Sequence, residues 1–236
     1  MNPRIVITEN WFTKPTRDSA YFSTFVLGIL LSLVGYLYIH GNEPFQKTIS
    51  ASGHLVFQEA QYWRLWTTLF AHADFAHLLG NLVLLLPLSF VITSYFGVWV
   101  FPMLGLFVGG VINYVVLKTM PVSTGLIGIS GVVYWMGSLW IVLFMLIDRR
   151  KSVRQRIALG LFFTVVLFIP ETYKAEISYL SHFVGYVLGV ISGGLIYVLY
   201  RKTFLAAEVK EYLYEGELDV LPIESPDDVL PPKSEI

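Results

Sequence analysis

Six apolar runs, separated by polar or turn-rich breaks, dominate the sequence. A bilayer core about 30 Å thick needs about 20 helical residues to cross it, and five of the runs reach that length. The fifth run is shorter, but Arg154 and Arg156 before it can extend it by reaching to the interface. The pattern predicts an all-α integral membrane protein with six transmembrane helices. The expected spans are Tyr21–Ile39, Ala76–Phe96, Val98–Leu117, Leu126–Ile147, Ile157–Ile169 and Ser178–Tyr200.

The composition supports lipid as the solvent of this chain. Hydrophobic residues make up 55% of the sequence and charged residues 14%, whereas a soluble domain carries roughly 25% charged residues. A net charge of −1 gives no basic field that would attract nucleic acid. The chain has no cysteine, which excludes disulfides, thiolate zinc sites and cysteine nucleophiles. We therefore expect the protein to interact with the lipid bilayer and not with nucleic acid.

The charges also predict an orientation and three regions. With the N-terminus in the cytoplasm, the inner segments carry 12 Lys and Arg residues and the outer loops carry 4. Positive charge favours the cytoplasmic side, so both termini are expected there. Residues 1–20 form a cytoplasmic segment, residues 21–201 the membrane domain, and residues 202–236 an acidic tail whose composition is typical of disorder.

Four polar residues lie inside the predicted spans, where polar groups are costly and often functional. His77 and Asn81 are on the second span, Ser130 opens the fourth, and His182 opens the sixth. Counted from the inner ends of their spans, His77, Ser130 and His182 all lie about 25–29 Å above the inner face. This spacing puts a hydroxyl and two imidazoles at one depth, a little below the outer surface.

These residue types are those of a serine hydrolase. A serine hydroxyl needs a base to take its proton, and histidine is the usual base. Acyl transfer also needs hydrogen-bond donors for the developing oxyanion. His77 and Asn81 are four residues apart and share a helix face, and a helix beginning at Ser130 adds backbone N–H groups. Tyr134, one turn after Ser130, is placed to stack on His182.

Small residues predict close packing of the fourth and sixth spans. Gly185, Gly189 and Gly193 recur every four residues on the sixth span, a face that lets another helix approach. Gly131 offers a matching notch beside Ser130. No metal site is expected, because His72 and His77 lack the spacing and the glutamate of a His-Glu-x-x-His helix.

Each of these residues also has a purely structural interpretation. Ser130 alone is more often a helix N-cap, His182 a core histidine, and Asn81 a hydrogen-bonding link between helices; His72 suits a loop-fixing hydrogen bond. Two other functions fit a multi-span protein, namely a non-enzymatic binder of client helices and a small-molecule transporter. A paired serine and histidine argue against the first, and polar groups near one face, not at the midplane, argue against the second.

The motifs taken together resemble the rhomboid family of intramembrane serine proteases. The matching pieces, in order, are Trp63-Arg64, then His72, His77 and Asn81 separated by four and three residues, then Gly128-Ile129-Ser130-Gly131, and finally His182 followed by Gly185 and Gly189. The resemblance covers roughly residues 20–201, and it implies a six-transmembrane-helix rhomboid-like bundle.

The resemblance also implies roles for these residues. Ser130 would be the nucleophile and His182 the base of a dyad without a carboxylate. His77 and Asn81, with the Ser130 backbone N–H, would bind the oxyanion, and Tyr134 would orient His182. The glycines would support close helix packing. Such an enzyme cleaves transmembrane segments of other proteins near the outer membrane boundary, without metal or cofactor. The compact layout favours a bacterial cytoplasmic membrane.

Overall fold

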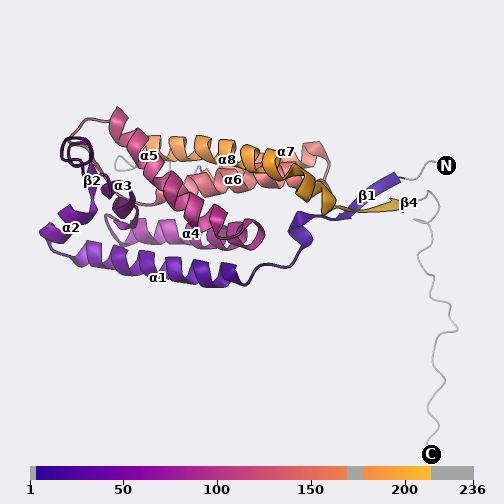
Figure 1. Cartoon of the computed structure of the whole chain (residues 1–236), viewed down its shortest axis with the longest axis horizontal. Coiled ribbons are helices and arrows are strands. Elements are labelled where there is room, and N and C mark those ends of the chain that lie inside the picture. The colour runs from indigo at the N-terminus through magenta and orange to yellow at the C-terminus, as the bar shows by residue number, and fades with distance from the viewer. Residues whose placement is uncertain (1–3, 169–177, 214–236) are drawn as a thin grey trace, which may run out of the picture.

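The computed structural model describes residues 4–168 and 178–213, and these form an elongated bundle of helices (Figure 1). Among the described residues, five helical segments are long and apolar enough to cross a membrane. They are Ser19–His40 (α1), Phe75–Phe96 (α4), Trp99–Thr119 (η4, Trp99–Leu104, with α5, Gly105–Thr119), Ser130–Ile147 (α6) and Tyr179–Ala206 (α8). The chain is therefore mostly helical, as expected, although two short sheets show that it is not all-α.

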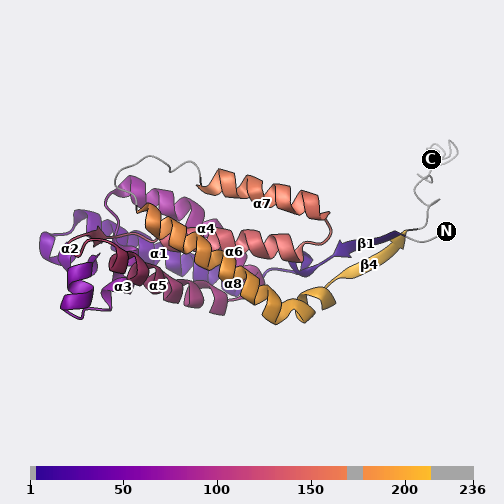
Figure 2. The same cartoon turned by 90° about the horizontal axis from the view of Figure 1, so that it is seen from above.

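The expected fifth span corresponds to α7, Val153–Phe168. It begins four residues earlier than expected, and its 16 described residues make it shorter than the other membrane-crossing candidates. The expected end of this span at Ile169 lies outside the described residues. α7 runs beside α6 (Figure 2), and a Cβ atom on Gly160 would lie 2.5 Å from the sulfur of Met145 on α6.

The pattern of burial agrees with lipid around the bundle. α6 lies at its centre, and every residue from Gly131 to Leu139 is buried. α1 buries only Ala20, Leu27, Leu31 and Gly35, and its other face exposes large side chains such as Phe22. Extended apolar surface of this kind is unfavourable in water and suits a hydrocarbon environment.

α6 and α8 pack closely through glycines, as the sequence predicts. A Cβ atom on Gly185 would overlap the carbonyl oxygen of Gly131, and one on Gly189 would overlap Ser138. Without side chains at these positions, the two backbones touch directly. The contact is fixed by hydrogen bonds between the helices, including one from the Ser138 hydroxyl to the carbonyl of Tyr186 at 2.9 Å.

Two expected spans include residues that are not helical in the structure. The span expected over Val98–Leu117 contains a break, because Phe101, inside η4, has extended backbone angles. The span expected to begin at Leu126 begins instead at Ser130. Residues Gly125–Leu126 form strand β3, which pairs antiparallel with β2, Ala51–Ser52. The apolar run thus begins in a strand that precedes the helix, and hydropathy alone does not distinguish the strand from the helix.

The long connection between α1 and α4 folds into short elements at one end of the bundle. These are α2 (Glu43–Ile49), β2, η2 (His54–Gln58), α3 (Arg64–Thr67) and η3 (Thr68–Phe70). Arg64 is buried and donates hydrogen bonds to the carbonyls of Lys47, Thr48 and Ser50, at 2.5–2.8 Å. These carbonyls end α2 and lack partners within the helix, so Arg64 caps α2 and fixes the loop.

The segments before α1 and after α8 meet at the other end of the bundle. Strand β1 (Arg4–Glu9) pairs antiparallel with β4 (Val209–Leu213), and the pair extends beyond the helices (Figure 1). Ordered structure therefore passes the expected boundary at residue 201, because α8 continues to Ala206 and β4 follows. The rest of the predicted tail, residues 214–236, lies outside the described residues.

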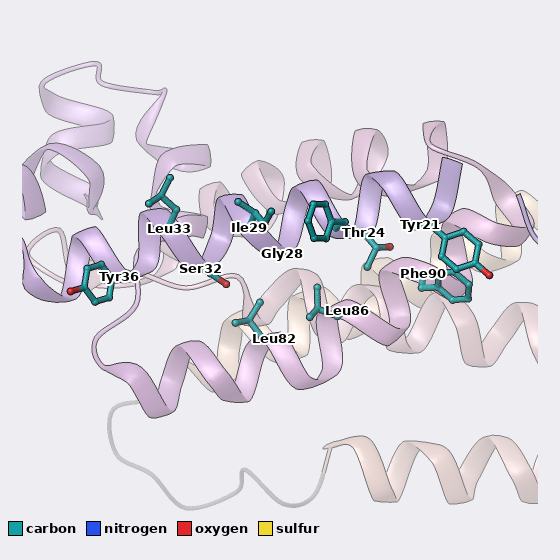
Figure 3. A pocket seen from close by; sticks show the side chains of 11 residues that line it. Tyr21, Thr24, Gly28, Ile29, Ser32, Leu33, Tyr36, Leu82, Leu86 and Phe90 are labelled. Carbon is teal, nitrogen blue, oxygen red and sulfur yellow. The ribbon is translucent and has the colours of Figure 1, made fainter. Parts of the chain in front are cut away.

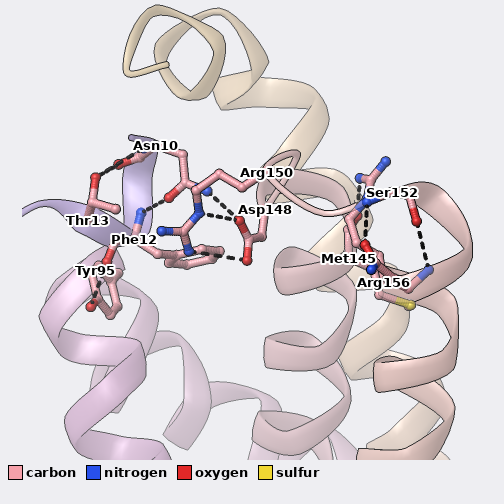
Figure 4. A network of polar contacts seen from close by, with 10 residues as sticks. Asn10, Phe12, Thr13, Tyr95, Met145, Asp148, Arg150, Ser152 and Arg156 are labelled. Atoms are coloured by element: carbon pink, nitrogen blue, oxygen red, sulfur yellow. Dashed lines mark hydrogen bonds and ion pairs between the residues drawn. The ribbon is translucent and has the colours of Figure 1, made fainter. Parts of the chain in front are cut away.

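A polar network attaches the N-terminal segment to the bundle (Figure 4). Asn10, just before the short helix η1 (Trp11–Thr13), donates to the carboxylate of Asp148 at 2.7 Å. Asp148 is the C-cap of α6 and also accepts from Arg150 at 2.7 Å. The buried carboxylate is thus compensated by a cation and an amide. The tyrosine hydroxyl of Tyr95, near the end of α4, donates to the carbonyl of Phe12.

Candidate active site

Ser130 is the first residue of α6, at the end of the bundle opposite β1 and β4. The turn that leads into it passes through Gly128, whose φ of +105° is readily adopted only by glycine. The Gly128 N–H donates to the carbonyl of Thr68 at 3.0 Å, which holds the turn against η3. The N-cap is Ile129, not Ser130. The hydroxyl of the half-buried Ser130 is therefore not explained by the capping role that its sequence context suggests.

His182 lies in the first turn of α8 and is buried. Its ring stacks on Tyr134, with ring centroids 4.0 Å apart and an angle of 13° between the planes. Tyr134 is one turn after Ser130 on α6, so the stack places the imidazole next to the start of that helix. The Nε2 atom of His182 is buried and has no hydrogen-bond partner among the described residues.

The glycine contact explains why the starts of α6 and α8 come together. A Cβ atom on Gly131 would lie 2.5 Å from the hydroxyl oxygen of Ser181 and 3.0 Å from Ile112. Gly131 follows Ser130 and Ser181 precedes His182, so the two flanking residues are in direct contact. Gly185, one turn further along α8, packs on the backbone of Gly131.

His77 and Asn81 reach the same region from α4. The N-cap Asp74 accepts a hydrogen bond from the backbone N–H of His77 at 2.7 Å, which fixes the first turn. The half-buried His77 ring faces the Gly128 turn, because a Cβ atom on Gly128 would lie 3.0 Å from both Cε1 and Nε2 of His77. Asn81 is buried and donates from Nδ2 to the carbonyl of His77 at 3.1 Å.

The bond made by Asn81 is within its own helix, so the structure does not support the alternative that Asn81 links two helices. A side-chain amide carries two N–H groups, and one of them remains for a ligand. The four polar residues predicted inside the spans therefore lie in the first two turns of α4, α6 and α8.

His72 is fully buried in the turn between η3 and α4. Its Nδ1 atom lies 3.2 Å from the carbonyl oxygen of Phe70 and donates to it, which is the loop-fixing bond expected from the sequence. The ring also packs edge-to-face against His77, with centroids 5.0 Å apart and an interplanar angle of 68°. Burial and the neighbouring charge of His77 lower the pKa of His72 to about 4, so the ring is neutral at pH 7.

Three supporting residues have contacts that the sequence analysis does not specify. Asp74 caps α4, and an Asp placed just before an apolar periodic run is a known start signal for a helix. Thr68 holds the Gly128 turn through its carbonyl and donates its hydroxyl to the carbonyl of Leu126. Arg64 caps α2. The last two act across 58 and 14 residues of sequence, which local patterns do not reveal.

The described residues hold no cluster of three or more His, Asp or Glu side chains suited to a metal ion. A groove of about 730 Å³ lies elsewhere, between α1 and α4, and Figure 3 shows its apolar lining. Leu82 and Leu86 of α4 border this groove, but the polar residues described above do not. The groove therefore does not belong to the site.

Comparison with known families agrees with this geometry. A family model for the rhomboid domain matches residues 59–199, more than half of the chain. The match includes all of α4 to α7, most of α8 and every polar residue of the site. No curated protein matches the chain significantly. The chain therefore belongs to the rhomboid family and is an intramembrane serine protease, a hydrolase of peptide bonds.

Proposed function

We propose that Ser130 and His182 form a catalytic dyad that cleaves transmembrane segments of other membrane proteins near the outer membrane boundary. The observation that carries this proposal is the stack of His182 on Tyr134, one turn from Ser130. The buried Nε2 of His182 supports it, because this atom has no competing hydrogen-bond partner among the described residues and a general base needs an available lone pair. Tyr134 orients the ring of this base.

In the acylation step, Nε2 of His182 accepts the proton of the Ser130 hydroxyl as Oγ attacks the peptide carbonyl carbon. The new C–O bond forms, the C=O electrons move to the oxygen, and a tetrahedral oxyanion results. The protonated His182 then donates its proton to the nitrogen of the leaving amine. The C–N bond breaks, the amine departs, and an ester to Ser130 remains.

The oxyanion is stabilised by the imidazole of His77, the second N–H of Asn81 and the backbone N–H of Ser130. Support comes from the position of His77 beside the Gly128 turn and from the free N–H of the Asn81 amide. The start of α6 adds the positive end of its helix dipole. Fixed donors of this kind, surrounded by apolar residues, stabilise developing charge more strongly than water does.

Deacylation uses one water molecule. His182 accepts a proton from the water as its oxygen attacks the ester carbon, and the same donors hold the second oxyanion. The tetrahedral intermediate then collapses, the acid product leaves, and Ser130 Oγ regains the proton from His182. The half-buried positions of Ser130 and His77 support access of water to the site.

We further propose six spans, with α7 as the short fifth, and both termini in the cytoplasm of a bacterial cell whose cytoplasmic membrane holds the protein. The basic residues at the β1–β4 end support this orientation, since Lys and Arg favour the cytoplasmic side. These residues are Lys14, Arg17, Arg149, Arg150, Lys151, Arg154, Arg156, Arg201, Lys202 and Lys210. The site at the other end of the bundle then lies near the outer face.

A substrate helix must unwind before it can be cut, because its carbonyls are hydrogen-bonded within the helix. Substrates with glycine or other weak helix formers near their outer boundary are therefore preferred. Because the proposed site lies below the outer membrane surface, the substrate moves laterally from the lipid to reach the dyad.

The experiment uses the full chain in proteoliposomes with a single-span substrate that carries such residues. A fluorophosphonate, which forms a covalent bond with an activated serine, labels the native protein. Ser130→Ala and His182→Ala each abolish both labelling and cleavage while the protein remains folded. Cleavage by Ser130→Ala at the native rate would disprove the dyad, and cleavage near the inner boundary would disprove the orientation.

A further inference from the structure

His72 makes a contact that the dyad chemistry does not use. Its Nδ1–H is held by the carbonyl of Phe70, and its ring then meets His77 edge-to-face. Both rings are confined, since His72 is fully buried and His77 also lies against the Gly128 turn. The His77 ring thus has two fixed neighbours, a buried imidazole and a backbone turn.

The His72 ring itself is fixed independently of His77. With Nδ1 as the donor to a carbonyl, the neutral ring carries its lone pair on Nε2, which is buried and has no partner among the described residues. A buried acceptor without a donor costs about 1–3 kcal/mol. A phenyl ring or an alkyl group at this position would avoid that cost. The imidazole therefore has to be explained by more than filling space.

We propose that His72 is a positioning residue that holds the imidazole of His77 in place to stabilise the oxyanion. This inference rests on the proposed function, because it assigns His77 as an oxyanion donor. The bond to Phe70 fixes the His72 ring in the turn before α4. The fixed His72 ring then restricts the orientation of the His77 ring through edge-to-face packing. Aromatic pairs at such separations contribute about 0.5–1.5 kcal/mol beyond the area they bury, enough to favour one orientation of a ring.

Three variants separate the ring from the hydrogen bond. His72→Ala removes both, His72→Asn keeps a donor for the Phe70 carbonyl without the ring, and His72→Phe keeps a ring without the donor. The full chain in proteoliposomes is assayed for kcat and KM on the single-span substrate, and thermal unfolding is measured in parallel. His54→Ala serves as the matched control, because His54 is an exposed histidine in the same connection between α1 and α4.

We expect His72→Ala and His72→Asn to lower kcat with little change in KM. The decrease in kcat should be smaller than the decrease of about 10²–10³-fold that follows removal of an oxyanion donor. His72→Phe retains more of kcat than either, and His54→Ala leaves kcat unchanged. If His72→Asn keeps native kcat while His72→Phe loses it, the residue only fixes the loop and the proposal fails.

A double-mutant cycle with His77→Ala tests the proposal even if one variant folds poorly. A residue that acts through His77 has little further effect on kcat once His77 is gone. Equal fold-changes from His72→Ala with and without His77 would overturn the proposal. Failure of the proposed function is distinguishable, because it appears as native cleavage by Ser130→Ala, whereas failure for His72 leaves Ser130→Ala inactive.

Discussion

Replacing Gly185 with alanine tests whether the contact between α6 and α8 sets the geometry of the site. The added methyl group would overlap the carbonyl oxygen of Gly131, a backbone atom that no side-chain rotation can move. The helices must therefore separate, by more than about 1 Å, to restore an ordinary van der Waals contact. Gly131 adjoins Ser130, and Gly185 lies one turn after His182. Separation of the helices at this contact therefore moves Ser130 away from His182.

The expected effect on activity is larger than the effect on stability. A displacement of 1 Å at a reacting centre can cost about 10²-fold in rate. Overpacking costs roughly 1–3 kcal/mol of stability, but alanine in place of a helical glycine returns about 1 kcal/mol. We therefore expect Gly185→Ala to remain folded, with cleavage reduced about 10²-fold.

The assay compares cleavage rates in proteoliposomes with thermal unfolding of the same samples. Gly194→Ala is the matched control on the same helix, because a Cβ atom at Gly194 would have no neighbour within 4 Å. It should retain the native rate and gain stability. Native activity in Gly185→Ala would refute the argument that the glycine contact aligns Ser130 with His182.

Three further predictions concern single residues. Asn81→Ala should lower kcat by about 10²–10³-fold with a smaller change in KM, and near-native kcat would remove Asn81 from the oxyanion site. Gly128→Ala should destabilise the protein by about 1–3 kcal/mol, because alanine does not favour a φ of +105°; unchanged thermal unfolding would contradict this. Burial alone would raise the pKa of Asp148, but hydrogen bonds from Arg150 and Asn10 outweigh it and hold that pKa below its ordinary value. The folded state thus favours the carboxylate, and its stabilisation is present above pH 4 and lost as pH falls through the lowered pKa. Asp148→Asn should lack this acid-dependent loss, and identical pH profiles of unfolding for the two proteins would disprove the assignment.

Much of the helical framework could be predicted from hydropathy, because length and apolar composition are what a membrane helix requires. α1 and α4 lie within one or two residues of their expected bounds. Hydropathy failed where an apolar segment takes another backbone conformation. Leu126 is buried in a strand before the Gly128 turn, and Phe101 interrupts its run with extended angles. The strand Val209–Leu213 was missed because its partner is about 200 residues away.

The grouping of His77, Ser130 and His182 at one end of the bundle was predictable, because each lies near the start of a helix. The stacking of Tyr134 on His182 followed from one-turn spacing and the glycine face. The packing of His72 on His77 was not predicted, since the angle between a loop side chain and a helix side chain depends on the whole turn. The roles of Thr68 and Arg64 depend on carbonyls brought near by the folded loop, which no local pattern specifies.

Strand pairing between β1 and β4 has a consequence for the order in which this protein matures. The ribosome makes Arg4–Glu9 before every membrane helix described here, whereas their partner, Val209–Leu213, is made after all of these helices. During synthesis β1 therefore cannot pair with β4, and its backbone groups stay hydrated, until translation has passed residue 213. The β1–β4 ladder therefore forms late, and it can form only when β1 and β4 lie on the same side of the bilayer.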